Sequence, residues 1–112
     1  MSADDEVESV ATLLADDTVR CLLLATREGP LSAAEIADRC GVSETTVYRR
    51  IEDLAARDLV VEHTELDDGG HHSTYEATLD RVTVDVTDDG FEVAVERRDS
   101  MADAFTRLIE DL

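Results

Sequence analysis

The segment from Leu31 to Leu54, LSAAEIADRCGVSETTVYRRIEDL, constrains the fold more than any other part of the chain. Ser32 and Glu35 have the spacing of a capping box, in which each side chain satisfies a backbone N–H at the start of a helix. Gly41 is placed to take the left-handed conformation that ends this helix, and Ser43 is a favourable N-cap for the next one. The pattern predicts two helices joined by a turn of about four residues, the helix-turn-helix arrangement.

Helical periodicity also precedes this segment. Acidic residues 4–6 open a helix whose apolar residues 7, 10, 11 and 14 share one face. Asp16 and Asp17 are expected to cap a second helix over residues 18–28, which Gly29 and Pro30 end. Together with the helix-turn-helix, these segments predict a helical core in the first half of the chain.

The second half has the two-residue period of β-strands. Residues 59–66 and 73–79 are expected to form a hairpin, the wing, around the turn signal DDGG, and Leu31 a very short strand. Residues 81–87 and 91–97 are expected to form a second hairpin with Asp89-Gly90 as its tight turn. Ser100 would cap a last helix over 100–112. The predicted fold class is α+β: a winged helix-turn-helix, with a helical core and β-wing, extended by a C-terminal β-hairpin and helix.

Charge and composition restrict the class of protein. The 112 residues include 28 Asp and Glu against 10 basic residues, all Arg, for a net charge of −18, and no Lys, Asn or Gln. An acidic surface normally opposes nucleic-acid binding, but at molar salt the Debye length falls to about 3 Å and carboxylate repulsion is screened. The composition therefore favours the salt-rich cytoplasm of an extreme halophile; the alternative is an acidic protein from a high-GC organism.

Residues 12–61, with the order LSAAEIADRCGVSETTVYRRIEDL at their centre, resemble winged helix-turn-helix transcription regulators of the ArsR type. The resemblance continues more loosely through HHSTYEATL, and the C-terminal part is similar to small regulators of halophilic archaea. It implies a homodimer that binds double-stranded DNA through its third core helix. The vicinal cysteines and last-helix histidines of metal-sensing members are missing, so their sensor chemistry is not carried over and no cofactor or effector is assigned.

The expected recognition helix, residues 43–57, has a distinct outward face. At 100° per residue, Val47, Ile51 and Leu54 form the buried stripe, while Thr45 and Arg49 fall opposite. We expect Arg49 to bond guanine, and Thr45 a thymine methyl group or a base acceptor. The remaining expected DNA contacts on this helix are Tyr48 on its flank and three residues near phosphates, Ser43, Thr46 and Arg50. Glu44 is expected to serve the helix dipole rather than to contact a cytosine.

The alternative for Arg49 and Arg50 is a solvated pair bonded to Glu52, Asp53 or Glu35. Local charge argues against it: residues 39–57 carry four Arg and three acidic residues, net +1, which leaves −19 for the remainder. The helix-turn-helix segment thus lacks the strong negative charge of the rest of the chain, as a DNA-facing surface requires.

The histidines of the expected wing permit three interpretations. His71 and His72 with Ser73 could touch DNA, which we include among the expected contacts, although a plain solvated loop is the more common role. Neighbouring strand residues point to opposite sides, so His71 and His72 do not chelate one ion together. His63 on the opposing strand could join one of them, but no metal site is predicted. Tyr75 is expected to pack into the core.

The other chemistry-bearing residues predict little. Cys21 and Cys40 are 19 positions apart and are expected to be buried free thiols, and Cys40 is not expected to sense oxidants. No nucleophile motif or phosphate loop is present, so no enzyme and no catalytic residue is predicted. The longest apolar run, residues 21–25, excludes a membrane span, and the acidic start lacks the features of a secretory signal, so a cytoplasmic protein is expected.

These expectations combine into one functional hypothesis. Residues 1–80 form a winged helix-turn-helix domain with an N-terminal helix, and residues 81–112 a dimerisation element that sets two recognition helices about 34 Å apart. The protein is expected to be a sequence-specific, homodimeric transcriptional regulator. The alternative is a winged-helix protein-interaction module that does not bind DNA.

Overall fold

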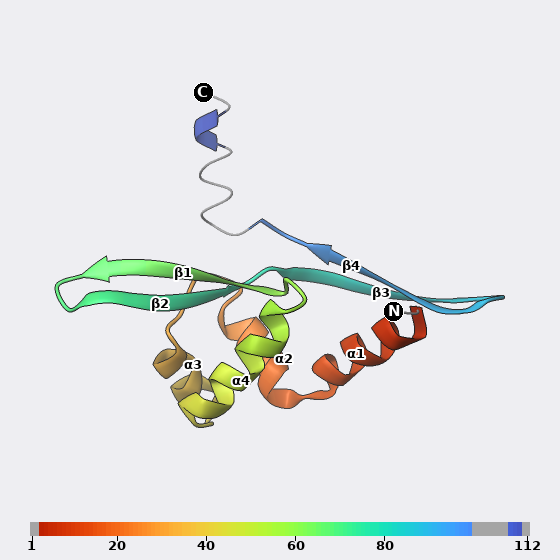
Figure 1. The fold of residues 1–112 in the computed structure, drawn as a ribbon, viewed down its shortest axis with the longest axis horizontal. Coiled ribbons are helices and arrows are strands. Elements are labelled where there is room, and N and C mark those ends of the chain that lie inside the picture. The colour runs from red at the N-terminus through yellow and green to blue at the C-terminus, as the bar shows by residue number, and fades with distance from the viewer. Residues whose placement is uncertain (1–2, 100–107, 111–112) are drawn as a thin grey trace.

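The computed structural model describes residues 3–99 and 108–110. Within residues 3–99, four helices and two antiparallel hairpins follow one another: α1 (Ala3–Ala15), α2 (Asp17–Ala25), α3 (Ala33–Cys40), α4 (Glu44–Ala55), β1 (Val60–Asp67), β2 (Gly70–Ala77), β3 (Leu79–Thr87) and β4 (Gly90–Arg97). The helices lie on one side of the hairpins, which extend in opposite directions from the middle of the molecule (Figure 1). This is the predicted α+β winged helix-turn-helix.

The caps predicted for the central helices are present. The Ser32 hydroxyl accepts a hydrogen bond from the Glu35 N–H at 3.2 Å, and the Ser32 N–H donates to the Glu35 carboxylate at 3.0 Å. Gly41 ends α3 with a φ of 66°, a backbone conformation that costs glycine little. Ser43 caps α4 by accepting from the Thr46 N–H at 3.1 Å. Local sequence therefore fixes the turn between α3 and α4.

Helix α2 ends earlier than its sequence pattern predicts. It begins after the N-cap Asp16, as expected, but stops at Ala25 rather than continuing to residue 28. Thr26 is fully buried, and its carbonyl accepts a hydrogen bond from the Ala77 N–H at 3.3 Å. The Thr26 carbonyl, which would accept an intrahelical hydrogen bond if α2 continued by another turn, is thus bonded to the end of β2 instead.

One hydrophobic core joins the helices to the wing. It is made by residues from α2, α3 and α4 together with the base of the first hairpin, chiefly Val19, Leu22, Ile36, Val47, Ile51, Leu54, Leu59 and Tyr75. The predicted stripe of α4 is confirmed, because Val47 and Leu54 have no exposed surface and Ile51 is 8% exposed. Tyr75 is buried as predicted, and its backbone pairs with Leu31 as a short third strand.

The second hairpin presents apolar pairs on one face. The register places Val82 opposite Val95, Val84 opposite Val93 and Val86 opposite Phe91. Its turn residues are Asp88 and Asp89, one position before the predicted Asp89-Gly90 turn, because Gly90 pairs with Thr87 and opens β4. Helix α1 contacts β4, but Val86 near the hairpin tip remains 73% exposed. Residues 108–110 are helical; the rest of the helix expected over 100–112 lies outside the described residues.

The prediction for the cysteines is wrong. Cys21 in α2 and Cys40 at the end of α3 form a disulfide, with their Cα atoms 5.9 Å apart, and neither residue is fully buried. Cα atoms joined by disulfides usually lie about 4.4–6.8 Å apart. The packing of α2 on α3 brings together two positions that are 19 residues apart in the sequence.

Candidate nucleic-acid interface

The N-terminal half of α4 presents polar side chains away from the core. Thr45, Tyr48 and Arg49 are all exposed, and Tyr48 keeps 51% of its surface accessible. Thr45 and Arg49 lie opposite the buried residues Val47 and Leu54, and Tyr48 lies on the flank of the helix, as the helical spacing predicts. In helix-turn-helix proteins the first turns of the second helix are the part that meets base edges.

Two further predicted contact residues serve the helix cap. The Ser43 hydroxyl accepts from the Thr46 N–H and also lies 3.0 Å from the Thr46 hydroxyl. Ser43 is exposed and Thr46 is half-buried. Both hydroxyls are thus held at the start of α4, where backbone N–H groups and the positive end of the helix dipole favour an anion.

Arg50 turns away from the exposed face of α4. Its Nε lies 2.8 Å from Oδ2 of Asp16, and about a third of each side chain is exposed. The partner is none of the three acidic residues considered from the sequence. Asp16 also accepts from the N–H groups of Thr18 and Val19 through Oδ1, so a single carboxylate caps α2 and pairs with α4.

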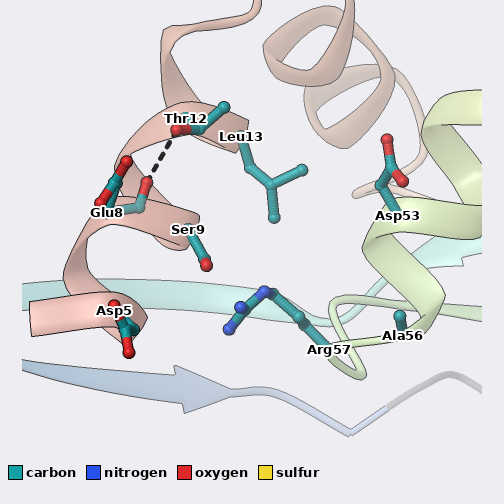
Figure 2. A pocket seen from close by; sticks show the side chains of 8 residues that line it. All are labelled: Asp5, Glu8, Ser9, Thr12, Leu13, Asp53, Ala56 and Arg57. Carbon is teal, nitrogen blue, oxygen red and sulfur yellow. Dashed lines mark hydrogen bonds between the residues drawn. The ribbon is translucent and has the colours of Figure 1, made fainter. Parts of the chain in front are cut away.

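The other two arginines of residues 39–57, Arg39 and Arg57, line two hollows elsewhere on the domain and not the exposed face of α4. Arg57 lines a hollow of about 530 Å³ between α1 and the end of α4, together with acidic residues from both helices (Figure 2). Arg39 lines a separate hollow beside Cys21. Of the four arginines counted from the sequence, Arg49 is therefore the one on the exposed face of α4, and the local charge of +1 overstates how basic that face is.

The histidines of the wing are placed differently from one another. His71 is exposed, whereas His72 lies between two carboxylates, with Nε2 3.4 Å from Glu65 and Nδ1 3.1 Å from Asp67. His63 pairs with Glu76, with Nε2 2.9 Å from Oε1 of that carboxylate. Within residues 3–99 and 108–110, no three His, Cys, Asp or Glu side chains converge as metal ligands would.

The buried carboxylate of Glu76 is not predicted by the sequence pattern. Glu76 is 1% exposed, its Oε1 lies within hydrogen-bond distance of His63 Nε2 at 2.9 Å, and it lies 3.9 Å from a guanidinium nitrogen of Arg98. Strand alternation points Tyr75 into the core, and it would point the next residue to solvent. The chain leaving β4 instead brings Arg98 over Glu76, where it also bonds the Ala77 carbonyl.

Two side chains near the interface have shifted pKa values. Hydrogen bonds from Ser32 lower the pKa of Glu35, with a smaller effect from Arg39. Burial raises the pKa of Tyr75 above its ordinary value of 10.0, helped by the negative charge of Glu62. The first shift keeps the capping box ionised, and the second keeps the phenol at the base of the wing neutral.

Comparison with known proteins supports this interpretation of α3 and α4. Residues 14–63 match the family model of a helix-turn-helix domain. The match includes α2, α3, α4 and the start of β1, and it ends within the wing. No curated protein matches the chain. No helix in residues 3–99 or 108–110 is long and apolar enough to cross a membrane.

Proposed function

We propose that this protein is a sequence-specific DNA-binding transcriptional regulator that places α4 in the major groove. The observation that carries the proposal is the exposed face formed by Thr45, Tyr48 and Arg49, on a helix whose opposite side is sealed in the core. The match of residues 14–63 to a helix-turn-helix domain supports it. Such a helix can read base edges while the rest of the domain keeps it at a fixed angle.

The side chains divide into base contacts and backbone contacts. Arg49 suits the two acceptors of guanine, and Thr45 suits a thymine methyl group or a base acceptor. Ser43 and Thr46, at the positively charged end of α4, suit phosphate oxygens. Because the Arg50 guanidinium already pairs with Asp16, Arg50 would contact DNA only if a phosphate oxygen replaced Asp16 as its partner or bound the guanidinium together with it. Exposed His71 and half-buried His72, at the outer end of the wing, would contact the neighbouring groove.

The acidic surface is compatible with this function in concentrated salt. At molar ionic strength the release of counterions from DNA contributes little, so base contacts and shape must supply the affinity. A face with only one exposed arginine therefore lowers the DNA affinity less in concentrated salt than it would in dilute salt. We therefore propose a halophilic, cytoplasmic regulator of the ArsR type.

A homodimer is part of the proposal. Residues 81–112 are proposed as the dimerisation element, because the apolar pairs at the tip of the second hairpin are uncovered: Val84 and Phe91 are each 49% exposed and Val86 is 73% exposed. A two-fold dimer through this element would present two copies of α4 to successive major grooves, about 34 Å apart.

The second candidate is a protein-interaction module without DNA binding. It is favoured by the pairing of Arg50 with Asp16 and by the position of Arg57 beside acidic residues, which leave little free positive charge near α4. Titration of labelled DNA from upstream of the protein's own gene, in about 2–3 M KCl, separates the two. Saturable binding that random DNA does not compete supports the regulator; a folded dimer that binds no fragment supports the module.

A further inference from the structure

The Cys21–Cys40 disulfide lies inside the helix-turn-helix rather than at its edge. It joins the second turn of α2 to the last residue of α3. Cys40 is followed at once by Gly41, which ends α3, and by the turn that leads to the N-cap of α4. The bond therefore holds the end of the helix that positions the proposed reading face.

The Cys21 end of this disulfide borders a hollow at the protein surface. Both cysteines are partly exposed, and Cys21 lines an open hollow of about 560 Å³ with Leu24, Ala25 and Arg39. Leu24 is 71% exposed, so it does not close the hollow. The hollow gives a small molecule room beside Cys21, whereas Cys40 packs against the hydrophobic core.

Arg39 brings positive charge to the hollow, although its charge also acts on the Glu35 carboxylate one helical turn earlier. Among the described residues that line it, Arg39 is charged and none is acidic, although the chain contains 28 Asp and Glu. A thiol attacks a disulfide as its thiolate, so a nearby cation assists the attack and an array of carboxylates would hinder it. In so acidic a protein, a disulfide beside an arginine is a favourable place for thiolate chemistry.

We propose that the Cys21–Cys40 bond is a reversible thiol-exchange site that takes a small anionic thiol. A first thiolate attacks Sγ of Cys21, forms a mixed disulfide, and releases Cys40 as a thiolate that takes up a proton. A second thiolate attacks the sulfur of the bound thiol, releasing the small-molecule disulfide and the Cys21 thiolate, which is protonated. The two cysteines gain two electrons, the two thiols lose them, and the small disulfide reverses the reaction.

The rest of α3 does not depend on the bond. Ala33, Ile36 and Ala37 are buried in the core, and the capping box holds the start of the helix. Reduction therefore leaves the domain folded but frees the end of α3 and the turn at Gly41 from α2. The geometry of α4 relative to α2 becomes less restricted, and DNA binding should weaken; this last consequence rests on the proposed function.

Thiol release tests the site without any assumption about DNA. The air-oxidised protein is incubated with mercaptoacetate or with neutral mercaptoethanol, and free thiols are titrated while circular dichroism follows the fold. We expect two thiols per chain with an unchanged helical signal. Arg39→Gln should slow the reaction with mercaptoacetate, which attacks as a dianion, about threefold at low salt, and should slow mercaptoethanol, which attacks as a monoanion, to a smaller extent. Two free thiols before reduction, or no release until the chain is unfolded in urea, would overturn the proposal.

A DNA titration of the oxidised and reduced protein tests the consequence. The oxidised form should bind at least about fivefold more tightly. The Cys21→Ser/Cys40→Ser double variant should bind like the reduced form and ignore thiols. Equal DNA affinity in both redox states would contradict the proposed link between the disulfide and DNA binding, but it would not affect the evidence for thiol exchange from the thiol titration. Absence of DNA binding in both states would contradict the proposed function, and the thiol count would still decide the exchange site.

Discussion

Arg50 of α4 pairs with Asp16, the residue that caps α2, at 2.8 Å between Nε and Oδ2. The other carboxylate oxygen of Asp16 accepts from Thr18 and Val19. One side chain thus determines where α2 begins and holds α4 beside that point. The proposed reading helix is oriented by this polar contact as well as by the core.

Substitution of Asp16 separates its two roles. Asp16→Asn keeps an N-cap acceptor but removes the charge opposite Arg50, so it should cost less than 1 kcal/mol. Asp16→Ala removes both and should lower the free energy of unfolding by about 1–2 kcal/mol. Urea unfolding followed by circular dichroism measures both variants. Equal losses for the two substitutions would mean that the cap contributes nothing beyond the ion pair.

Glu76 should be the most sensitive acidic residue in the described part of the wing. Glu76→Ala leaves Arg98 and His63 without their buried partner, and breaking such a pair costs about 3 kcal/mol. Glu76→Gln retains an acceptor for His63 and should cost about half as much. Glu62 of β1 is exposed and accepts a hydrogen bond from the Ser73 hydroxyl, so Glu62→Ala is the control for loss of an exposed carboxylate and should cost less than about 1 kcal/mol. A loss for Glu76→Ala no larger than the control's would contradict the network.

Alkaline pH should destabilise the protein through Tyr75. Its pKa is raised in the folded state by burial, so the folded protein holds the phenolic proton more tightly than the unfolded chain. The resulting stability is present below the ordinary value of 10.0 and is lost as pH rises through the folded value. The chain contains no Lys, which would otherwise titrate in the same range. Urea midpoints across this pH range report the loss.

Tyr75→Phe should remove the part of this alkaline dependence that Tyr75 causes. Tyr48→Phe is the matched control, because Tyr48 is 51% exposed on α4. Absorbance of tyrosinate in the Tyr48→Phe variant follows Tyr75 alone. Ionisation of Tyr75 at or below its ordinary pKa in that variant would show that the phenol is not buried at the base of the wing.

The tip of the second hairpin should carry the dimer contact. Phe91→Arg places a charge among uncovered apolar pairs and should give monomers in light scattering. Leu66→Arg is the control, since Leu66 is also an exposed apolar residue, at 73% against 49% for Phe91, but lies at the tip of the wing. Removal of residues 100–112 should also give monomer or aggregate. A truncated chain or a Phe91→Arg variant that remains dimeric would exclude the corresponding part of residues 81–112 from the interface.

Sequence predicts the local features of this fold well because their causes are local. The capping box at Ser32, the left-handed Gly41 and the buried stripe of α4 depend on residues within one or two helical turns. Contacts between distant segments are not encoded in this way. The early end of α2 at Ala25 depends on Ala77, and the disulfide depends on how α2 packs against α3.

The candidate site shows the same division. The helical spacing correctly places Thr45, Tyr48 and Arg49 on the exposed face of α4. It does not reveal that Arg50 reaches back to α2, or that Arg57 faces a hollow beside α1. A helical angle gives the direction of a side chain but not the element that lies there. The same limit hides Glu76, whose burial depends on Arg98 after β4.

The central claim is that α4 reads DNA through Arg49. Fluorescence anisotropy of a labelled upstream fragment, in about 2–3 M KCl, compares the protein with Arg49→Ala and with Arg81→Ala, an exposed arginine on β3. We expect saturable binding that Arg49→Ala weakens by about 1–3 kcal/mol with the fold unchanged, while Arg81→Ala binds like the original protein. Equal binding by the two variants would contradict the claim, as would a folded protein that binds no fragment.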